Sequence, residues 1–128
     1  MLNCLIGVQV NHPIHVDYAL GVMVVHSAAD VKIEDIYDTI AKLEQIAEET
    51  GIHKALLDLR AEVSLPSMIE MFEMAKKFPK TLWIAAVLEA SREIEEEVEF
   101  VETVAKNRGA PLRIFREEDE ALEWLQLM

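Results

Sequence analysis

The sequence has few of the residues on which several kinds of site are built. Its single cysteine, Cys4, excludes an internal disulfide and any metal site made of paired cysteines. With four glycines, it has little means of bringing backbone amides close to a phosphate. No apolar run approaches the roughly 18 residues that cross a bilayer, and the first residues lack the basic start of a signal peptide. We therefore expect a cytoplasmic protein with no metal and no cofactor.

Basic residues are also scarce, because 12 lysines and arginines face 24 acidic residues and the net charge is −12. A chain of this charge repels phosphate backbones and anionic lipid headgroups unless a local basic patch overrides the mean. The sequence thus predicts no binding to nucleic acid or to anionic membranes. Disorder is excluded, since 52% of the residues are hydrophobic. The length predicts one domain that spans residues 1–128.

Hydrophobic periodicity predicts strands that alternate with helices. The strands are expected at residues 14–18, 22–26, 55–59, 82–88 and 112–115, the first two as a hairpin. The helices are expected at about 33–50, 65–78, 92–108 and 118–127. Ser64 is expected to cap the second helix, and residues 1–13 fit either an edge strand or a loose arm. This order predicts an α/β fold, a single mostly parallel sheet with one antiparallel strand and four alternating helices.

The carboxyl-terminal part carries a distinctive pattern, with Asn-Arg-Gly at 107–109, Phe115, and Ala-Leu-Glu-Trp-Leu at 121–125. Together with the element order, this pattern resembles the SpoIIAA-like branch of the STAS superfamily over roughly residues 14–127. The resemblance implies the same small α/β fold. It also implies one of two functions known in that superfamily, a regulatory domain that binds a kinase-like partner or a carrier of lipids and other apolar ligands.

Regulatory members of that family carry an Asp-Ser-Ser-Gly segment after the strand that corresponds to residues 55–59, and one of its serines is phosphorylated. Counted from Asp58, the first serine of the pattern falls on Ser67 and the phosphorylated one on Met68. The chain therefore departs from the phosphorylation pattern. Ser64 and Ser67 still lie near a predicted helix N-terminus, which favours a phosphate electrostatically. Their simpler role is in capping that helix.

The second predicted helix is rich in methionine and aromatic residues. One stripe can pack on the sheet, and it consists of Met68, Ile69, Phe72 and Ala75. A second stripe widens the apolar surface beyond a single sheet contact, and it consists of Met71, Met74 and Phe78. Methionine is common on surfaces that accept varied partners. The helix is therefore either a wide core face or a binding surface.

Polar side chains follow two of the predicted strands, at the edge where open parallel sheets bind ligands. His26, Asp58 and Arg60 would all lie there, with serines nearby. A histidine, a carboxylate and a serine could form a hydrolytic set. However, no Gly-x-Ser-x-Gly or His-Glu-x-x-His motif accompanies them. We expect no catalytic residues and retain a small hydrolase as a distant alternative.

Charge is distributed unevenly along the chain. Residues 51–90 hold five acidic and five basic residues, whereas residues 91–128 hold eleven acidic and five basic ones. We therefore expect a non-catalytic binding module that presents residues 60–67 and the methionine-rich helix to a protein partner or to a second copy of itself, as a homo-oligomer. The alternative is a carrier of an apolar ligand such as a lipid or fatty acyl chain. The binding candidates are Ser64, Ser67, Met68, Met71, Met74 and Phe78.

Overall fold

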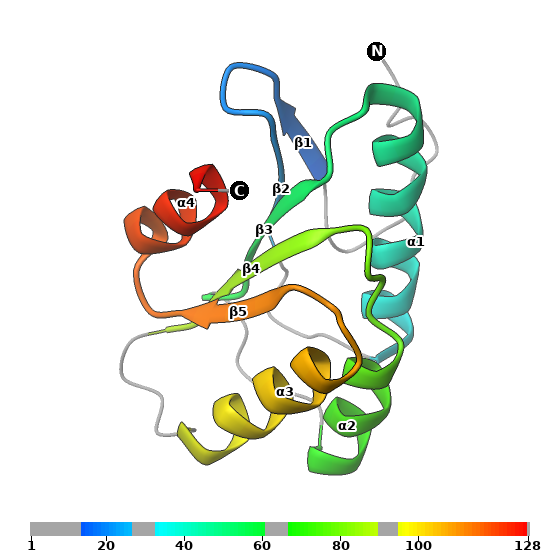
Figure 1. The fold of residues 1–128 in the computed structure, drawn as a ribbon, viewed down its shortest axis with the longest axis vertical. Helices are drawn as coiled ribbons and strands as arrows, with labels where there is room; N and C mark the ends of the chain where they lie inside the picture. The colour runs from blue at the N-terminus through cyan, green and yellow to red at the C-terminus, as the bar shows by residue number, and fades with distance from the viewer. Residues whose placement is uncertain (1–13, 27–32, 61–66, 90–94, 128) are drawn as a thin grey trace.

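The computed structural model describes residues 14–26, 33–60, 67–89 and 95–127. Its elements follow the order β1 (Ile14–Asp17), β2 (Val22–His26), α1 (Ile33–Thr50), β3 (Lys54–Asp58), α2 (Met68–Lys76), β4 (Trp83–Val87), α3 (Glu95–Asn107), β5 (Leu112–Phe115) and α4 (Glu118–Gln126). The described strands form one sheet in the order β1-β2-β3-β4-β5 (Figure 1). β1 is antiparallel to β2, and the other neighbours are parallel. The predicted α/β class is confirmed, while residues 1–13 lie outside the described ranges.

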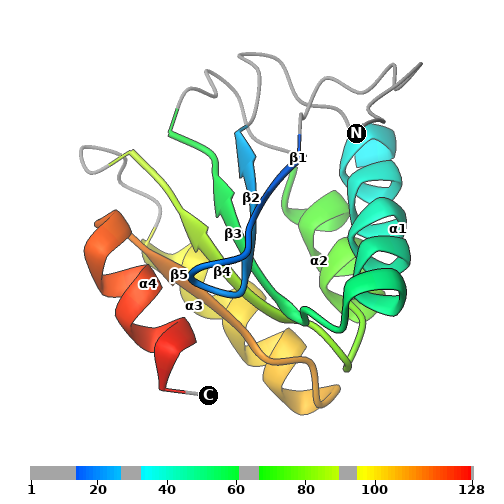
Figure 2. The same cartoon turned by 90° about the horizontal axis from the view of Figure 1, so that it is seen from above.

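The strand order is the same in space as in the sequence, and this places the first three helices together. Each parallel connection moves one strand along the sheet in the same direction, so crossovers of one hand put their helices on one face. Side chains of α1, α2 and α3 accordingly share one core cluster, whereas α4 packs on the opposite face with a second cluster. Figure 2 shows α1 and α2 on one side of the sheet and α4 on the other.

Alternation along the strands builds both cores. Met23, Ala55, Leu57, Ile84 and Ala86 face the three-helix side and are buried. The residues between them face α4, where the buried side chains are Val22, Leu56, Ala85 and Val87 with Ala121 and Leu125 of the helix. Both faces of β3 and β4 are therefore apolar, as expected for strands that are covered on both sides.

Aromatic rings join α4 to the sheet. The ring centroids of Trp83 and Trp124 lie 5.5 Å apart, and those of Phe115 and Trp124 lie 5.9 Å apart. Tilted aromatic pairs at this distance add to the stabilisation that comes from buried area. Phe115 and Trp124, two residues of the family-like pattern at the carboxyl end, therefore have structural roles in this fold.

The start of α2 differs from the sequence prediction. The helix was expected at residues 65–78 with Ser64 as its cap, but it begins at Met68 with Ser67 as the N-cap. Ser67 Oγ accepts the Glu70 amide at 3.2 Å, and the Glu70 carboxylate accepts the Ser67 amide at 3.0 Å. This capping box satisfies two amides that would otherwise be unpaired. At the other end Phe78 lies outside the helix, because the residue before a proline disfavours helical backbone.

At the outer edge of β5, two amides that point away from the sheet form hydrogen bonds within the chain. In a parallel edge strand, alternate amides point away from the neighbouring strand. The Leu112 amide donates to the Ala110 carbonyl at 3.0 Å, and the Ile114 amide donates to Glu102 Oε2 at 2.7 Å. A carboxylate that accepts a backbone amide forms a strong charge-assisted bond. Glu102 thus fastens α3 to the strand that follows it.

Two leucines at the end of α4 provide a test of the second core. Leu125 is fully buried, whereas Leu127 is 76% exposed. We expect Leu125→Ala to lower the free energy of unfolding by about 2–5 kcal/mol, because it leaves a cavity against the sheet. Leu127→Ala should change it by less than about 0.5 kcal/mol. Urea denaturation followed by circular dichroism measures both, and equal losses would contradict the packing of α4.

Candidate functional site

The carboxyl ends of β2 and β3 bring together the three polar residues that the sequence places at this edge. His26 and Asp58 are partners in the parallel register, and His26 Nδ1 lies 3.2 Å from Asp58 Oδ2. Arg60 follows two residues after Asp58 and folds back onto it. The site is therefore a compact cluster of one imidazole, one carboxylate and one guanidinium at the edge where parallel sheets bind their ligands.

Arg60 binds Asp58 with both arms of its guanidinium. Arg60 Nε donates to Asp58 Oδ1 at 2.8 Å, and Nη2 donates to Oδ2 at 2.9 Å. The Arg60 amide also donates to Oδ1 at 3.2 Å. Bidentate pairs of this kind specify geometry as well as energy. They hold the chain in a turn as it leaves β3 towards residues 61–66, which lie outside the described ranges.

The same guanidinium reaches a second carboxylate from a distant part of the sequence. Arg60 Nη2 donates to Glu118 Oε1 at 2.8 Å, and Glu118 is the first residue of α4. Arg60 therefore links the end of β3 to the helix on the α4 face of the sheet. Sequence patterns did not identify Glu118, because 58 residues separate it from Arg60 and no local motif connects the two.

The cluster also sets the charge of its carboxylate. The hydrogen bonds from Arg60 lower the pKa of Asp58 from 3.8 to about 2, against the opposing effect of burial. The same hydrogen bonds raise the pKa of Arg60 above its ordinary value. Asp58 is thus ionised at neutral pH and its oxygens are engaged by the guanidinium. A carboxylate with so low a pKa is a weak proton acceptor, so the pair is suited to holding position rather than to general-base chemistry.

The hydrolase alternative requires a serine or threonine hydroxyl that forms a hydrogen bond with the His26 ring. Within the described ranges, no serine or threonine hydroxyl forms a hydrogen bond with the His26 ring. Ser67, the described serine of this region, uses its hydroxyl to cap α2. Ser64 lies outside the described residues. The geometry therefore assembles the histidine and the carboxylate of a hydrolytic set without a nucleophile in the part of the chain that is described.

Two candidate side chains of the methionine-rich segment point inwards, one within α2 and one just after it. Met74 and Phe78 are buried in the core between α2 and the sheet. Both therefore fit the first of the two predictions for this helix, a wide core face, and neither lies at the surface. The helix contributes a different apolar residue to the surface, because Ile69 in its first turn is 77% exposed. The side chains of Met68 and Met71 lie outside the description.

A second arginine fastens the neighbouring loop at the same edge of the sheet. Arg116, directly after β5, donates from Nη1 to the Glu89 carbonyl at 2.8 Å and from Nη2 to Glu95 Oε2 at 3.1 Å. It thus connects the end of β5, the second residue after β4 and the first turn of α3. Two arginines, Arg60 and Arg116, therefore hold the chain where it leaves three of the strands.

The described ranges also bear on metal binding and on membrane insertion. In them, no group of three or more His, Cys, Asp or Glu side chains is placed to hold a metal ion. No helix of the same ranges has both the length and the apolar composition needed to cross a membrane.

The mostly parallel five-stranded sheet, with three helices on one face and one on the other, has a STAS-like fold. Among solved structures, the crystal structure of an anti-sigma factor antagonist from Mycobacterium paratuberculosis is similar, with a TM-score of 0.55. The similarity covers 90% of this chain and 92% of that chain at 14% sequence identity, so it concerns the fold. No model of a protein family matches the sequence. No curated protein matches it either.

Acid should remove the stabilisation that Asp58 provides. A carboxyl group with a folded-state pKa near 2 and an ordinary value of 3.8 stabilises the fold above the ordinary value, and this contribution is lost as the pH falls through the folded value. Because solvent screens the partly exposed pair, we expect a loss of about 1 kcal/mol between about pH 5 and pH 2. Urea unfolding should show this loss in the wild type relative to Asp58→Asn. Parallel pH profiles for the two proteins would contradict the assignment.

Proposed function

We propose that this chain is a non-catalytic binding module that presents the carboxyl edge of its sheet to a protein partner. The contact would use Arg60 and the exposed start of α2, with residues 61–66 between them. The observation that carries the proposal is the ion-pair cluster. In it the Arg60 guanidinium forms two hydrogen bonds with Asp58 and one with Glu118. Such a cluster orders the chain before a partner arrives, which reduces the entropy that binding costs.

An exposed apolar side chain supports a protein as the partner. Ile69 is 77% exposed in the first turn of α2, two residues after the N-cap. Arginine is enriched at protein interfaces, and burial of an exposed isoleucine side chain against a partner is favourable. Arg60 is itself partly exposed, so part of its guanidinium remains available to a partner. The segment that leaves β3 therefore carries both kinds of contact within ten residues.

The comparison with solved structures supports the same class of function. The similar protein from Mycobacterium paratuberculosis is described as an antagonist of an anti-sigma factor, and such an antagonist acts on another protein. We infer a regulatory binding role of this general kind for the present chain. Met68 stands where phosphorylated members of the family carry a serine, so we expect the switch to differ from phosphorylation at that position.

Site-specific photo-crosslinking tests the proposal. A photoreactive phenylalanine analogue placed at Ile69 should capture one protein in the cells that make this chain, and mass spectrometry identifies the adduct. Isothermal titration with the purified partner should then show a loss of about tenfold or more in affinity for Ile69→Glu. The matched control is Leu127→Glu, since Leu127 is 76% exposed and Ile69 is 77% exposed. This control should bind like the wild type.

Three outcomes would contradict the proposal. The first is an adduct at position 127 with none at position 69. The second is a bound lipid mass in native mass spectrometry of the protein from its own cells, which would favour the apolar-ligand carrier. The third is an Ile69→Glu variant that binds the identified partner as tightly as the wild type. An adduct between two copies of the chain would make the partner a second copy of the protein.

A further inference from the structure

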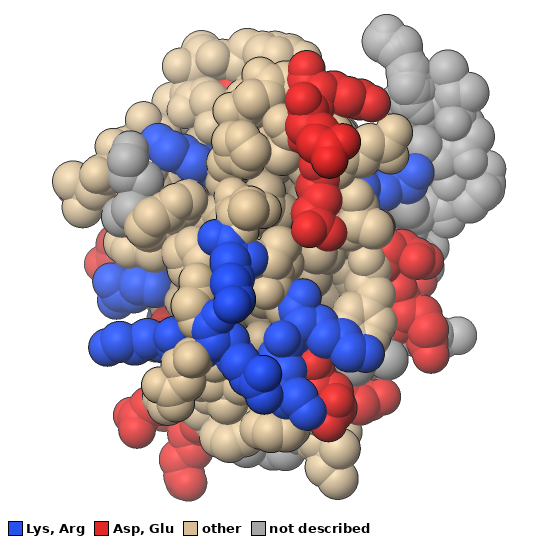
Figure 3. Space-filling view, turned by 45° about the vertical axis from the view of Figure 1, so that its right-hand side comes forward, with Lys and Arg blue, Asp and Glu red and all other residues tan. Residues whose placement is uncertain are grey.

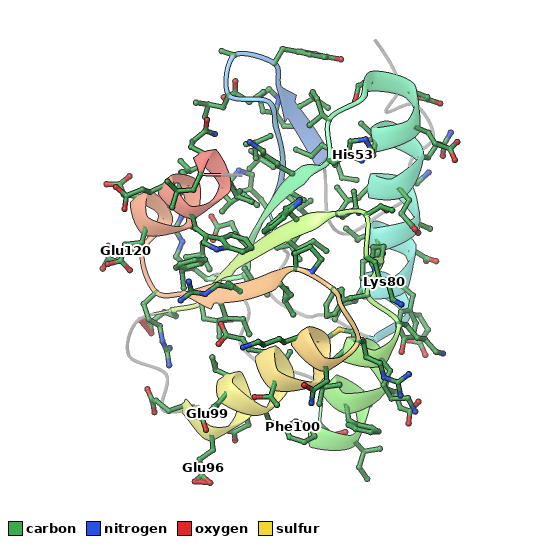
Figure 4. All side chains as sticks on the ribbon, in the orientation of Figure 1. His53, Lys80, Glu96, Glu99, Phe100 and Glu120 are labelled. Atoms are coloured by element: carbon green, nitrogen blue, oxygen red, sulfur yellow. The ribbon has the colours of Figure 1, made fainter. Side chains whose placement is uncertain are left out.

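Five of the twelve basic residues of this acidic protein lie at the carboxyl ends of two neighbouring helices. We call this group the basic patch, and it consists of Lys76, Lys77, Lys80, Lys106 and Arg108. Figure 3 shows lysine and arginine side chains gathered on this side of the molecule, and Figure 4 shows Lys80 between α1 and α2, away from Glu96 and Glu99. The patch stands at the amino edge of the parallel sheet, because it precedes β4 and β5 in the chain.

Several contacts bring the two halves of the patch together. α2 and α3 pack against each other, and the Phe72 and Phe100 rings stack with centroids 5.8 Å apart. The strands that follow these helices, β4 and β5, are parallel neighbours, and the Ile84 amide at the start of β4 donates to the Pro111 carbonyl just before β5 at 2.9 Å. The Lys80 stem lies beside Gly109, with its Cδ 3.8 Å from where a Cβ would stand. Lys80 therefore neighbours the loop that carries Arg108.

The patch has few acidic partners of its own. Lys76 lies 3.5 Å from the Glu73 carboxylate, and its ammonium stands 4.9 Å from the Phe72 ring centroid. Lys77 stands 5.0 Å from the Tyr37 ring centroid. Among the described residues, no carboxylate lies within ion-pair distance of the other four members, Lys77, Lys80, Lys106 and Arg108. In a chain with 24 acidic residues, four such cations at one place are a local surplus of positive charge.

Compensation of the helix dipoles explains only part of the patch. A cation in the last turn of a helix is favourable, and Lys76 and Lys106 supply it for α2 and α3. α1 and α4 have no basic residue in their last turns, so the chain does not use this device generally. The other members, Lys77, Lys80 and Arg108, lie beyond the helices. Three positive charges therefore remain after the dipoles are satisfied.

We propose that the basic patch binds a short acidic segment of a partner protein. Its five positive charges are opposite in sign to a run of a few carboxylates and similar to it in number. A long polyanion fits less well, because the molecule outside the patch is strongly acidic, as in the first turns of α3 and α4. The patch lies at the edge of the sheet opposite to Arg60. The inference thus goes beyond the proposed function and stands independently of it.

A labelled octaglutamate peptide tests the inference directly. Fluorescence anisotropy in about 20 mM salt should show binding of octaglutamate and none of octaglutamine, and about 150 mM salt should weaken the binding through screening. The double charge reversal Lys80→Glu with Arg108→Glu should weaken binding by about tenfold or more. The matched control is Lys42→Glu with Arg113→Glu, which changes the net charge equally outside the patch. It should bind within about twofold of the wild type.

Four results would overturn the inference. The first is a wild type that binds octaglutamate no better than octaglutamine. The second is a control pair that loses as much affinity as the patch pair while both remain folded by circular dichroism. The third is tighter binding of a twelve-nucleotide oligothymidine than of octaglutamate, which would make nucleic acid the occupant. The fourth is a wild-type oligomer in sedimentation that the patch reversal dissociates, which would make a second copy the occupant.

Discussion

The consecutive strand order constrains most of this structure. Because β2, β3, β4 and β5 follow one another in space as in sequence, three crossovers of one hand place α1, α2 and α3 on a single face. The other face then has α4 alone to cover it. The same constraint separates the two edges of the sheet. The strand ends with His26, Asp58 and Arg116 meet at one edge, and the helix ends with the basic patch meet at the other.

The two edges are held by different chemistry. At the carboxyl edge, arginines are paired with carboxylates and carbonyls, and the paired charges hold the chain as it leaves the strands. At the amino edge, cations stand largely without carboxylate partners among the described residues. A paired charge contributes to order, whereas a surplus charge attracts a ligand of the opposite sign. The carboxyl edge is therefore ordered before a partner binds. The amino edge carries an excess of positive charge.

Local patterns in the sequence predicted the elements better than their contacts. The helix at 33–50 and the strands at 22–26 and 112–115 have the bounds that the periodicity indicates. The start of α2 differs from the prediction, because Ser64 and Pro66 resemble a helix start although the capping box is formed by Ser67 and Glu70. Periodicity identifies an apolar face but does not say what packs against it. The structure was therefore needed to show that Met74 and Phe78 are buried.

Long-range contacts could not be predicted in the same way. Glu118 and Arg60 carry no shared local signal, although the register makes the meeting of His26 and Asp58 a consequence of parallel pairing. The basic patch combines residues from two windows of the sequence, one neutral and one acidic on average. Averages over windows therefore concealed it. The packing of α2 against α3 and the pairing of β4 with β5 together bring Lys80 beside the loop that carries Arg108.

Glu102 limits how the protein can associate through its sheet. The outward amides of β5 already donate to Ala110 and to Glu102, so a foreign strand finds no free donor at Leu112 or Ile114. Fibrils that grow by edge-to-edge pairing need two open edges on every subunit. With these two donors engaged, the β5 edge offers a foreign strand fewer hydrogen bonds than an open edge would. The Glu102 carboxylate on α3 thus contributes to the protection of this edge against strand addition.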